Sequence, residues 1–142
     1  MTTTVRDLAI TYSGAWASHD PDAIGALHTA DSVFHLYDIA EPFIGRDAIR
    51  AAAAGFFADM PDLAFEPVRV HLGEGHFVSE YVMRGTRDGR QFACHGTDVF
   101  TVKDGLIQRK DSYIDWIAYQ RQTGIDIAAA AAAATNNSNA RH

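Results

Sequence analysis

Residues 96–107 read Gly-Thr-Asp-Val-Phe-Thr-Val-Lys-Asp-Gly-Leu-Ile and carry the clearest structural signal in the chain. Side chains of different character alternate from Gly96 to Val102, which is the period of a β-strand. Asp104-Gly105 then supplies the two residues that a tight hairpin turn needs for its positive φ angles. This stretch therefore predicts two antiparallel strands joined by a short turn.

The same signals continue toward the N-terminus of this hairpin. Gly73-Glu-Gly75 and Asp88-Gly89 are further turn sequences, and strand periodicity fills the segments between them. Pro67 lies inside the first of these segments, so we expect an edge strand or a bulge there. The predicted strands span about 63–72, 76–86, 90–102 and 106–116.

Before residue 63 the apolar side chains recur mainly at helical spacing. Asp20-Pro21 fits the start of a short helix, with Ile24, Leu27 and His28 on its inner side. The predicted elements of this half are helices over about 5–16, 21–28 and 47–60, and a strand over about 32–37.

A chain of 142 residues is about the size of one domain, and three helices followed by an antiparallel meander predict an α+β fold with helices on one sheet face. Residues 1–124 form the expected domain. Residues 125–142 contain the alanine run 128–134, which has no amphipathic face to bury, so we expect a frayed or disordered tail. The tail is left out of the expected site.

Composition excludes several classes of function. The net charge is −6 and the twelve Lys and Arg residues are scattered, which argues against a nucleic-acid partner. No signal peptide and no run of roughly 20 apolar residues is present, so we expect a cytoplasmic protein that does not cross a membrane. The single cysteine, Cys94, is expected to be a small buried hydrophobe.

Motifs for cofactors and metals are missing from the sequence. The seven histidines show no ligand spacing with Cys or acidic residues, so no metal site is expected. A dinucleotide fingerprint, a phosphate loop and a nucleophile elbow are also absent. We therefore expect chemistry that needs no cofactor.

Three fragments carry a family resemblance: Phe43–Ile49 (FIGRDAI), Met60–Leu63 (MPDL) and the hairpin 96–107. Their order and spacing over residues 5–120 resemble the NTF2-like superfamily, and within it the SnoaL-like polyketide cyclases and ketosteroid isomerases. The resemblance implies a cone in which a curved, mixed sheet wraps around three N-terminal helices and encloses a central apolar pocket. It also implies a homodimer formed through the outer sheet face.

Asp98 is the first candidate catalytic residue. Strand alternation places it on one face with Cys94, Gly96 and Phe100, so desolvation would raise its pKa and keep it protonated. A neutral acid there could donate a hydrogen bond to an oxyanion. The resemblance pairs Asp98 with Tyr12 in this role. The alternative is an Asp that caps a buried backbone group and a Tyr that only fills the core.

The general base is open at this stage. Asp38 follows the strand 32–37, where the resemblance puts the base of the isomerases, but an ungapped count from Gly45 puts Leu36 at that position. Asp38 can equally be a surface turn residue. His35 is a rival base with a convenient intrinsic pKa, although it has the opposite strand parity to Leu36.

The last strand offers a further acid. In the cyclases and in relatives similar to limonene-epoxide hydrolase, an acid on this strand is catalytic, and Asp111 is the nearest match. Spacing from Gly105 places Ser112 there unless the strand bulges, while Asp115 is expected to pair or cap. Tyr81 and Met83 stand where the epoxide hydrolases carry an Arg and an Asp, which disfavours their mechanism.

The bulky apolar side chains are expected to line the pocket, and their size implies a hydrophobic small-molecule substrate. The leading hypothesis is proton transfer next to a carbonyl by an isomerase, cyclase or dehydratase. A domain that only binds a hydrophobic ligand or dimerises is the alternative, and a modified epoxide hydrolase is the third. The expected lining residues are Trp16, Phe34, Phe56, Met60, Tyr81, Met83 and Phe100.

Overall fold

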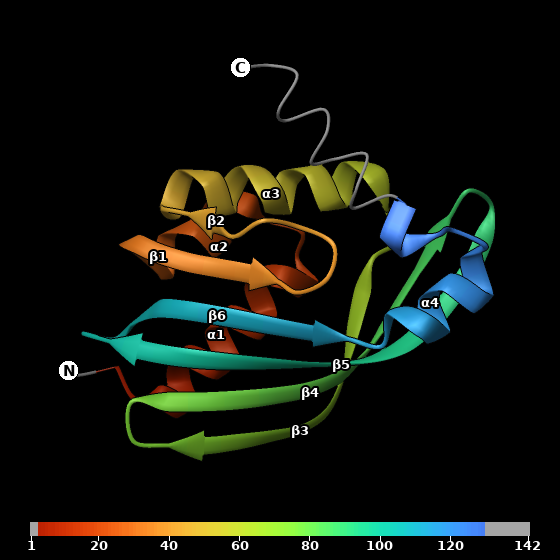
Figure 1. The fold of residues 1–142 in the computed structure, drawn as a ribbon. Helices are drawn as coiled ribbons and strands as arrows, with labels where there is room; N and C mark the ends of the chain where they lie inside the picture. Colours follow the sequence, from red (N-terminus) through yellow and green to blue (C-terminus); the bar gives the residue numbers. More distant parts are fainter. Residues whose placement is uncertain (1–2, 130–142) are drawn as a thin grey trace.

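The computed structural model describes residues 3–129, and Figure 1 shows their arrangement. Within these residues, four helices and six strands follow one another. They are α1 (Val5–Ala17), α2 (Pro21–Ala26), β1 (His28–Leu36), β2 (Phe43–Ile44), α3 (Arg46–Asp59), β3 (Ala64–Gly73), β4 (His76–Arg87), β5 (Arg90–Lys103), β6 (Leu106–Ile114) and α4 (Trp116–Thr123).

All six strands form one sheet, in the order β2-β1-β6-β5-β4-β3. Strands β1 and β6 are parallel, and the other neighbouring pairs are antiparallel. Strand β3 is an edge strand, and its register against β4 shifts between Pro67 and Arg69. The predicted α+β class and the disturbance at Pro67 are both confirmed, because proline cannot donate to a regular ladder.

The turns between the long strands have the predicted geometry. Asp88 and Gly89 have φ angles of 50° and 77°, and Asp104 and Gly105 have φ angles of 53° and 77°. Two successive positive φ angles define the hairpin turn whose twist matches that of the flanking strands. These turns keep β4, β5 and β6 in one continuous meander.

Helices α1, α2 and α3 lie on one side of the sheet, with α3 running along its β1 and β2 end (Figure 1). Thr4 caps α1 by accepting a hydrogen bond from the backbone of Asp7 at 3.0 Å. The buried side of α1 packs against the sheet in a cluster that includes Leu8, Phe77 and Phe100. This packing turns the inner face of β4, β5 and β6 toward the helices.

Three predicted boundaries are wrong. Helix α2 ends at Ala26, and His28 begins β1, so this strand starts before Ser32. Strand β6 ends at Ile114, and the chain then forms α4, which the strand prediction to residue 116 missed. Asp115 caps α4 by accepting from the backbone of Ala118 at 3.0 Å, in line with its predicted capping role.

Part of the predicted tail lies within the described residues. Ile125 and Ile127 pack against the core cluster around Met60, Tyr81 and Tyr119. Residues 130–142, which hold most of the alanine run, lie outside the described residues. None of the helices formed by residues 3–129 has the length and apolar character needed to cross a membrane.

Candidate functional site

A cavity of about 730 Å³ lies between the helices and the inner face of the sheet. This volume falls in the range of sites for small organic molecules, roughly 300–1,000 Å³. Its wall is mostly apolar and aromatic, and Ile125 and Ile127 from the predicted tail contribute to it. All seven residues expected to line the pocket do line it: Trp16, Phe34, Phe56, Met60, Tyr81, Met83 and Phe100.

Asp98 lies in the cavity wall on the inner face of β5, as the alternation of this strand predicts. Its Oδ1 accepts a hydrogen bond of 2.8 Å from the hydroxyl of Tyr81 on β4. Tyr81 is paired across the sheet with Gly96, and a Cβ atom at Gly96 would lie 2.5 Å from the Tyr81 ring. The glycine therefore leaves the room that lets Tyr81 lie over β5 and reach Asp98.

Lys110 on β6 is a site residue that the sequence pattern does not reveal. Its side chain is 5% exposed, and its Nζ lies 3.8 Å from Oδ2 of Asp98 and 3.1 Å from the hydroxyl of Tyr12. The ammonium also lies 4.3 Å from the ring centre of Trp16 and 4.5 Å from that of Phe34. The cavity thus contains a cation held by aromatic faces beside a carboxylate.

A bulge in β6 explains why Lys110 points inward. Val102 on β5 pairs with Ile107, whereas Thr101 pairs with Arg109, so Gln108 is an extra residue in β6. Beyond the bulge the inner face carries Lys110 and Ser112. Nothing in the polar run 108–112 indicates this change of parity, because no apolar alternation crosses it.

Tyr12 connects Lys110 to a second buried group. Its hydroxyl lies 3.0 Å from Nε2 of His28, and Nδ1 of His28 lies 2.8 Å from the hydroxyl of Ser32. Burial, with the charges of Lys110 and Arg46, lowers the pKa of His28 to about 3, and desolvation raises the pKa of Tyr12. His28 is therefore neutral at pH 7, and Tyr12 keeps its proton.

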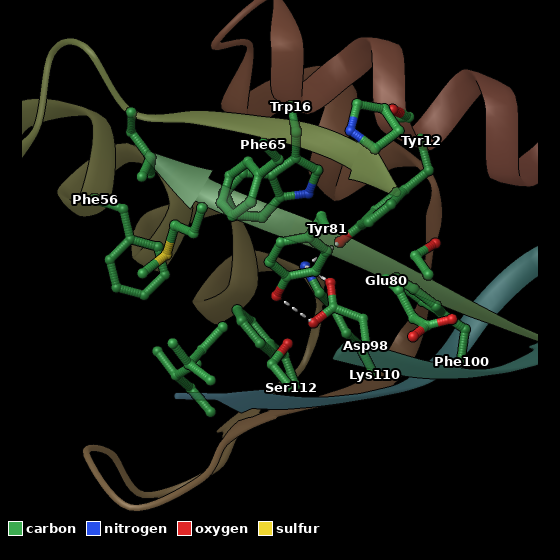
Figure 2. A pocket seen from close by; sticks show the side chains of 18 of the residues that line it. Tyr12, Trp16, Phe56, Phe65, Glu80, Tyr81, Asp98, Phe100, Lys110 and Ser112 are labelled. Carbon is green, nitrogen blue, oxygen red and sulfur yellow. Dashed lines mark hydrogen bonds and ion pairs between the residues drawn. The ribbon is translucent and has the colours of Figure 1, made fainter. Parts of the chain in front are cut away.

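These contacts form one buried chain, which runs from Ser32 through His28, Tyr12, Lys110 and Asp98 to Tyr81. Figure 2 shows its central members, with the labelled side chains of Tyr12, Tyr81, Asp98 and Lys110 directed toward the same part of the cavity. Desolvation and the neighbouring Asp98 raise the pKa of Tyr81 well above its ordinary value. Tyr81 is thus a neutral hydrogen-bond donor to Asp98.

The three predicted base candidates do not line the cavity. Asp38 is exposed in the loop after β1, with a φ angle of 74°. His35 has the opposite parity to Phe34 and Leu36, and it stacks on Tyr37 with 3.8 Å between ring centres. Asp38 and His35 therefore do not share the cavity with Asp98, which corrects the expectation that one of them is its general base.

Asp111 lies on the outer face of β6, paired across the sheet with Val99. It accepts hydrogen bonds from Arg109 at 2.9 Å and from the hydroxyl of Tyr37 at 3.0 Å. Its neighbour Ser112 lines the cavity in its place. The strand does bulge, at Gln108, and the bulge turns Ser112 rather than Asp111 inward, so the expectation that a bulge would favour Asp111 is wrong.

Two more acids line the cavity, and one cysteine is buried. Asp59 and Glu80 also contribute to the cavity lining, and Glu80 is paired with Arg69 and His71. Cys94 is buried, as predicted, and desolvation raises the pKa of its thiol to about 11. Within residues 3–129, no group of three His, Cys, Asp or Glu side chains is arranged to hold a metal ion.

Comparison with known proteins assigns the family. The family model of the SnoaL-like domain matches residues 9–110, a segment that contains most of α1, the first five strands and all six residues of the polar chain in the cavity. The chain belongs to the SnoaL-like domain family. The predicted family resemblance is thereby confirmed. No curated protein is similar enough in sequence to match this chain.

Solved structures agree with a SnoaL-like domain in fold. A protein from Catenulispora acidiphila with a ketosteroid isomerase-like fold, solved with trimethylamine, is 21% identical, and the match covers 88% of this chain and 97% of that one with a TM-score of 0.79. An NTF2-like protein from Burkholderia thailandensis is 17% identical, with coverage of 85% and 98% and a TM-score of 0.78. A candidate polyketide cyclase from Pseudomonas putida is 18% identical, with coverage of 87% and 98% and a TM-score of 0.76. These likenesses establish the NTF2-like cone fold.

Proposed function

We propose that this SnoaL-like domain is a cofactor-independent acid–base enzyme that moves a proton next to a carbonyl group of a hydrophobic small molecule. The product would be an isomer, a cyclised ring or a dehydrated species. The single observation that carries the proposal is Asp98, a carboxylate in the wall of an apolar cavity with Lys110 and Tyr81 in contact.

The surroundings of Asp98 support the role of general base. A carboxylate in the cavity wall can accept a proton from an acidic C–H group of a bound substrate. The sequence alone predicts the opposite role for Asp98, that of a neutral donor, because it does not show that Lys110 lies beside the carboxylate. Of the acids expected to be catalytic, Asp98 is the one that lines the cavity, and we assign the role of base to it.

Lys110 and Tyr12 supply the complementary electrophilic groups. When Asp98 takes the proton, negative charge moves from its carboxylate to the carbonyl oxygen of the substrate. Lys110 lies 3.8 Å from Asp98 Oδ2, so the same cation can face the charge before and after the transfer. Fixed donors of this kind stabilise an oxyanion without reorganisation during the reaction.

The cavity wall supports an apolar substrate. The phenyl and thioether side chains of Phe56, Met60 and Phe65 offer no hydrogen bonds to a substrate and suit a ring system. The SnoaL-like family and the similarity in fold to a candidate polyketide cyclase agree with this substrate class.

Proton exchange tests the proposal without knowledge of the natural substrate. The C–H bonds between the carbonyl and the ring of 2-tetralone are acidic, and their exchange in D₂O is followed by proton NMR. We expect the protein to accelerate exchange, and we expect Asp98→Asn to lower the enzymatic rate by about 10²- to 10⁴-fold. Equal rates for wild type and Asp98→Asn, in a variant that still binds 2-tetralone, would instead support a domain that only binds ligands.

A further inference from the structure

Strand β1 loses its regular pairing near its start. Its register against β6 shifts between His28 and Val33, and β1 holds the extra residues, which must bulge out of the ladder. Residues four apart in a regular strand are separated by about 13 Å. Nδ1 of His28 nevertheless lies 2.8 Å from the hydroxyl of Ser32. The bulge therefore brings together two side chains that are both fully buried.

The fragment 43–49 holds this bulge at the start of α3. The backbone N–H of Gly45 donates to the carbonyl of Ser32 at 2.7 Å. The guanidinium of Arg46 donates two hydrogen bonds, of 3.0 and 2.8 Å, to the carbonyl of His28. Gly45 has a φ angle of 93°, which glycine adopts without strain. Two neighbouring residues of the fragment thus fix both ends of the segment 28–32.

The direction of the hydrogen bonds at Tyr12 follows from the number of protons. Lys110 is a donor only, so the Tyr12 oxygen accepts its hydrogen bond of 3.1 Å. The acceptor in contact with the Tyr12 proton is then Nε2 of His28, at 3.0 Å. Neutral His28 carries its one proton on Nδ1 and donates it to Ser32. Turning the Tyr12 hydroxyl toward a substrate would leave Nε2 buried without a partner, which is unfavourable.

The hydrogen bond to Tyr12 fixes the ammonium of Lys110, which lies beside it in the cavity wall (Figure 2). The rings of Trp16 and Phe34 attract the cation without fixing the direction of its N–H bonds. Among the residues that the structure describes, Tyr12 provides the acceptor within hydrogen-bond distance, whereas Asp98 Oδ2 lies at 3.8 Å. A hydroxyl that already donates its own proton also accepts more strongly.

We infer that His28 and Tyr12 are positioning residues of this site, and that their hydrogen-bond chain holds the ammonium of Lys110 in place without donating to the substrate. This inference rests on the proposed function, because the position of the ammonium matters where Asp98 transfers a proton. Tyr12 then contributes to the electrophilic groups through Lys110. The fragment 43–49 gains a role as well, since it fixes the bulge that carries the chain.

The tautomer of His28 tests the inference in the wild-type protein. Long-range ¹⁵N–¹H NMR correlations show which ring nitrogen carries the proton, and the loss of one set of signals in His28→Gln assigns that set to His28. At pH 7 we expect the proton on Nδ1, with Nε2 free to accept from Tyr12. A proton on Nε2 would overturn the inference, because Tyr12 would then have its own proton available for a substrate.

Proton exchange of 2-tetralone separates a positioning role from direct contact. Tyr12→Phe keeps the ring and removes the hydroxyl, and we expect it to lower the maximal exchange rate by about 10- to 100-fold. In a Lys110→Met background the same substitution should change the rate by less than about twofold, because its effect passes through the ammonium. A loss of the same size in both backgrounds would contradict the positioning role.

Variants of His28 provide a second test that does not depend on the folding of Lys110→Met. His28→Gln places an amide oxygen near the position of Nε2 and should keep most of the exchange rate. His28→Leu offers no acceptor and should lose exchange as Tyr12→Phe does. Combined with Tyr12→Phe, it should lower the rate by less than about twofold more. A wild-type rate in His28→Leu would show that the chain does not position Lys110.

Tyr37→Phe is the matched control, because it removes a hydroxyl that donates to Asp111 on the outer face. It should exchange 2-tetralone at the wild-type rate. Absence of exchange in wild type, with the His28 proton on Nδ1, would overturn the proposed function and leave the hydrogen-bond chain intact. Exchange that depends on Asp98 but not on Tyr12 or His28 would overturn only the inference.

Discussion

Strand β6 contributes a cation to two ion pairs on opposite faces of the sheet, and the two pairs differ in exposure and in geometry. On the outer face Arg109 and Asp111 form two hydrogen bonds of 2.9 Å, with side chains that are 44% and 15% exposed. On the inner face Lys110 and Asp98 are 3.8 Å apart, with side chains that are 5% and 10% exposed. The pair with the better geometry is the one whose cation is open to water.

The difference shows what each pair contributes. An exposed pair adds at most about 1 kcal/mol to stability, so the good geometry of the outer pair is expected to change stability little. Removing two charges from water costs several kcal/mol per ion, and a distance of 3.8 Å recovers little of this in hydrogen bonding. The inner pair is therefore not expected to stabilise the fold. Its position in the cavity wall agrees better with a role in the proposed proton transfer.

The largest expected effect comes from breaking the inner pair on one side. Lys110→Met leaves the carboxylate of Asp98 buried without a cation, which should lower the free energy of unfolding by about 3–5 kcal/mol. Urea denaturation at pH 7 measures this change. A loss below about 1 kcal/mol would mean that the inner pair resembles an exposed one.

Removing both inner charges should have a much smaller effect on stability. The double variant Lys110→Met with Asp98→Asn should unfold within about 2 kcal/mol of wild type, because no uncompensated charge remains. Its 2-tetralone exchange should still be lost. If the double variant is as unstable as the sum of the two single variants, the residues do not act as a pair.

The sequence was sufficient for the meander because its turns depend on local chemistry. Asp88-Gly89 and Asp104-Gly105 adopt positive φ angles in any context that needs a tight hairpin. The inner face of β5 was also predictable, because Phe92, Cys94 and Phe100 alternate with more polar residues and place Asp98 among them.

The site was predictable only in part because the parity of β6 depends on a tertiary feature. The bulge at Gln108 turns Lys110 inward and Asp111 outward, and a run of polar residues contains no signal for it. The buried histidine was missed for a related reason, since His28 fits the inner side of a longer α2.

The homodimer and the cytoplasmic location stay predictions.

His28, a buried residue of β1, gives a prediction that depends on pH. Its pKa falls from 6.5 in the unfolded chain to about 3 in the folded chain, so between these values the unfolded chain binds the extra proton. Its contribution to stability is complete above pH 6.5 and is lost as pH falls toward 3, by at most about 1.4 kcal/mol per pH unit.

Urea denaturation between pH 7 and pH 4 isolates this contribution. His28→Gln should flatten the decline in stability relative to wild type. His35→Gln, a matched change on the outer face, should leave the decline as it is. A wild-type slope in His28→Gln would contradict the assignment of a neutral buried His28.

The smallest expected effect belongs to the outer pair. Arg109→Gln removes a charge that is 44% exposed, and we expect it to change the free energy of unfolding by at most about 1 kcal/mol. Salt should reduce even this effect. A loss comparable to that of Lys110→Met would remove the distinction between the two faces of β6.

The same chemical change on the two faces tests the central claim most directly. Asp98→Asn and Asp111→Asn each replace one carboxylate with an amide of the same shape, on the inner and the outer face. Their rates of 2-tetralone proton exchange are compared with that of wild type under identical conditions. We expect Asp98→Asn to lose about 10²- to 10⁴-fold and Asp111→Asn to keep the wild-type rate. Loss of exchange in Asp111→Asn with a wild-type rate in Asp98→Asn would contradict the account.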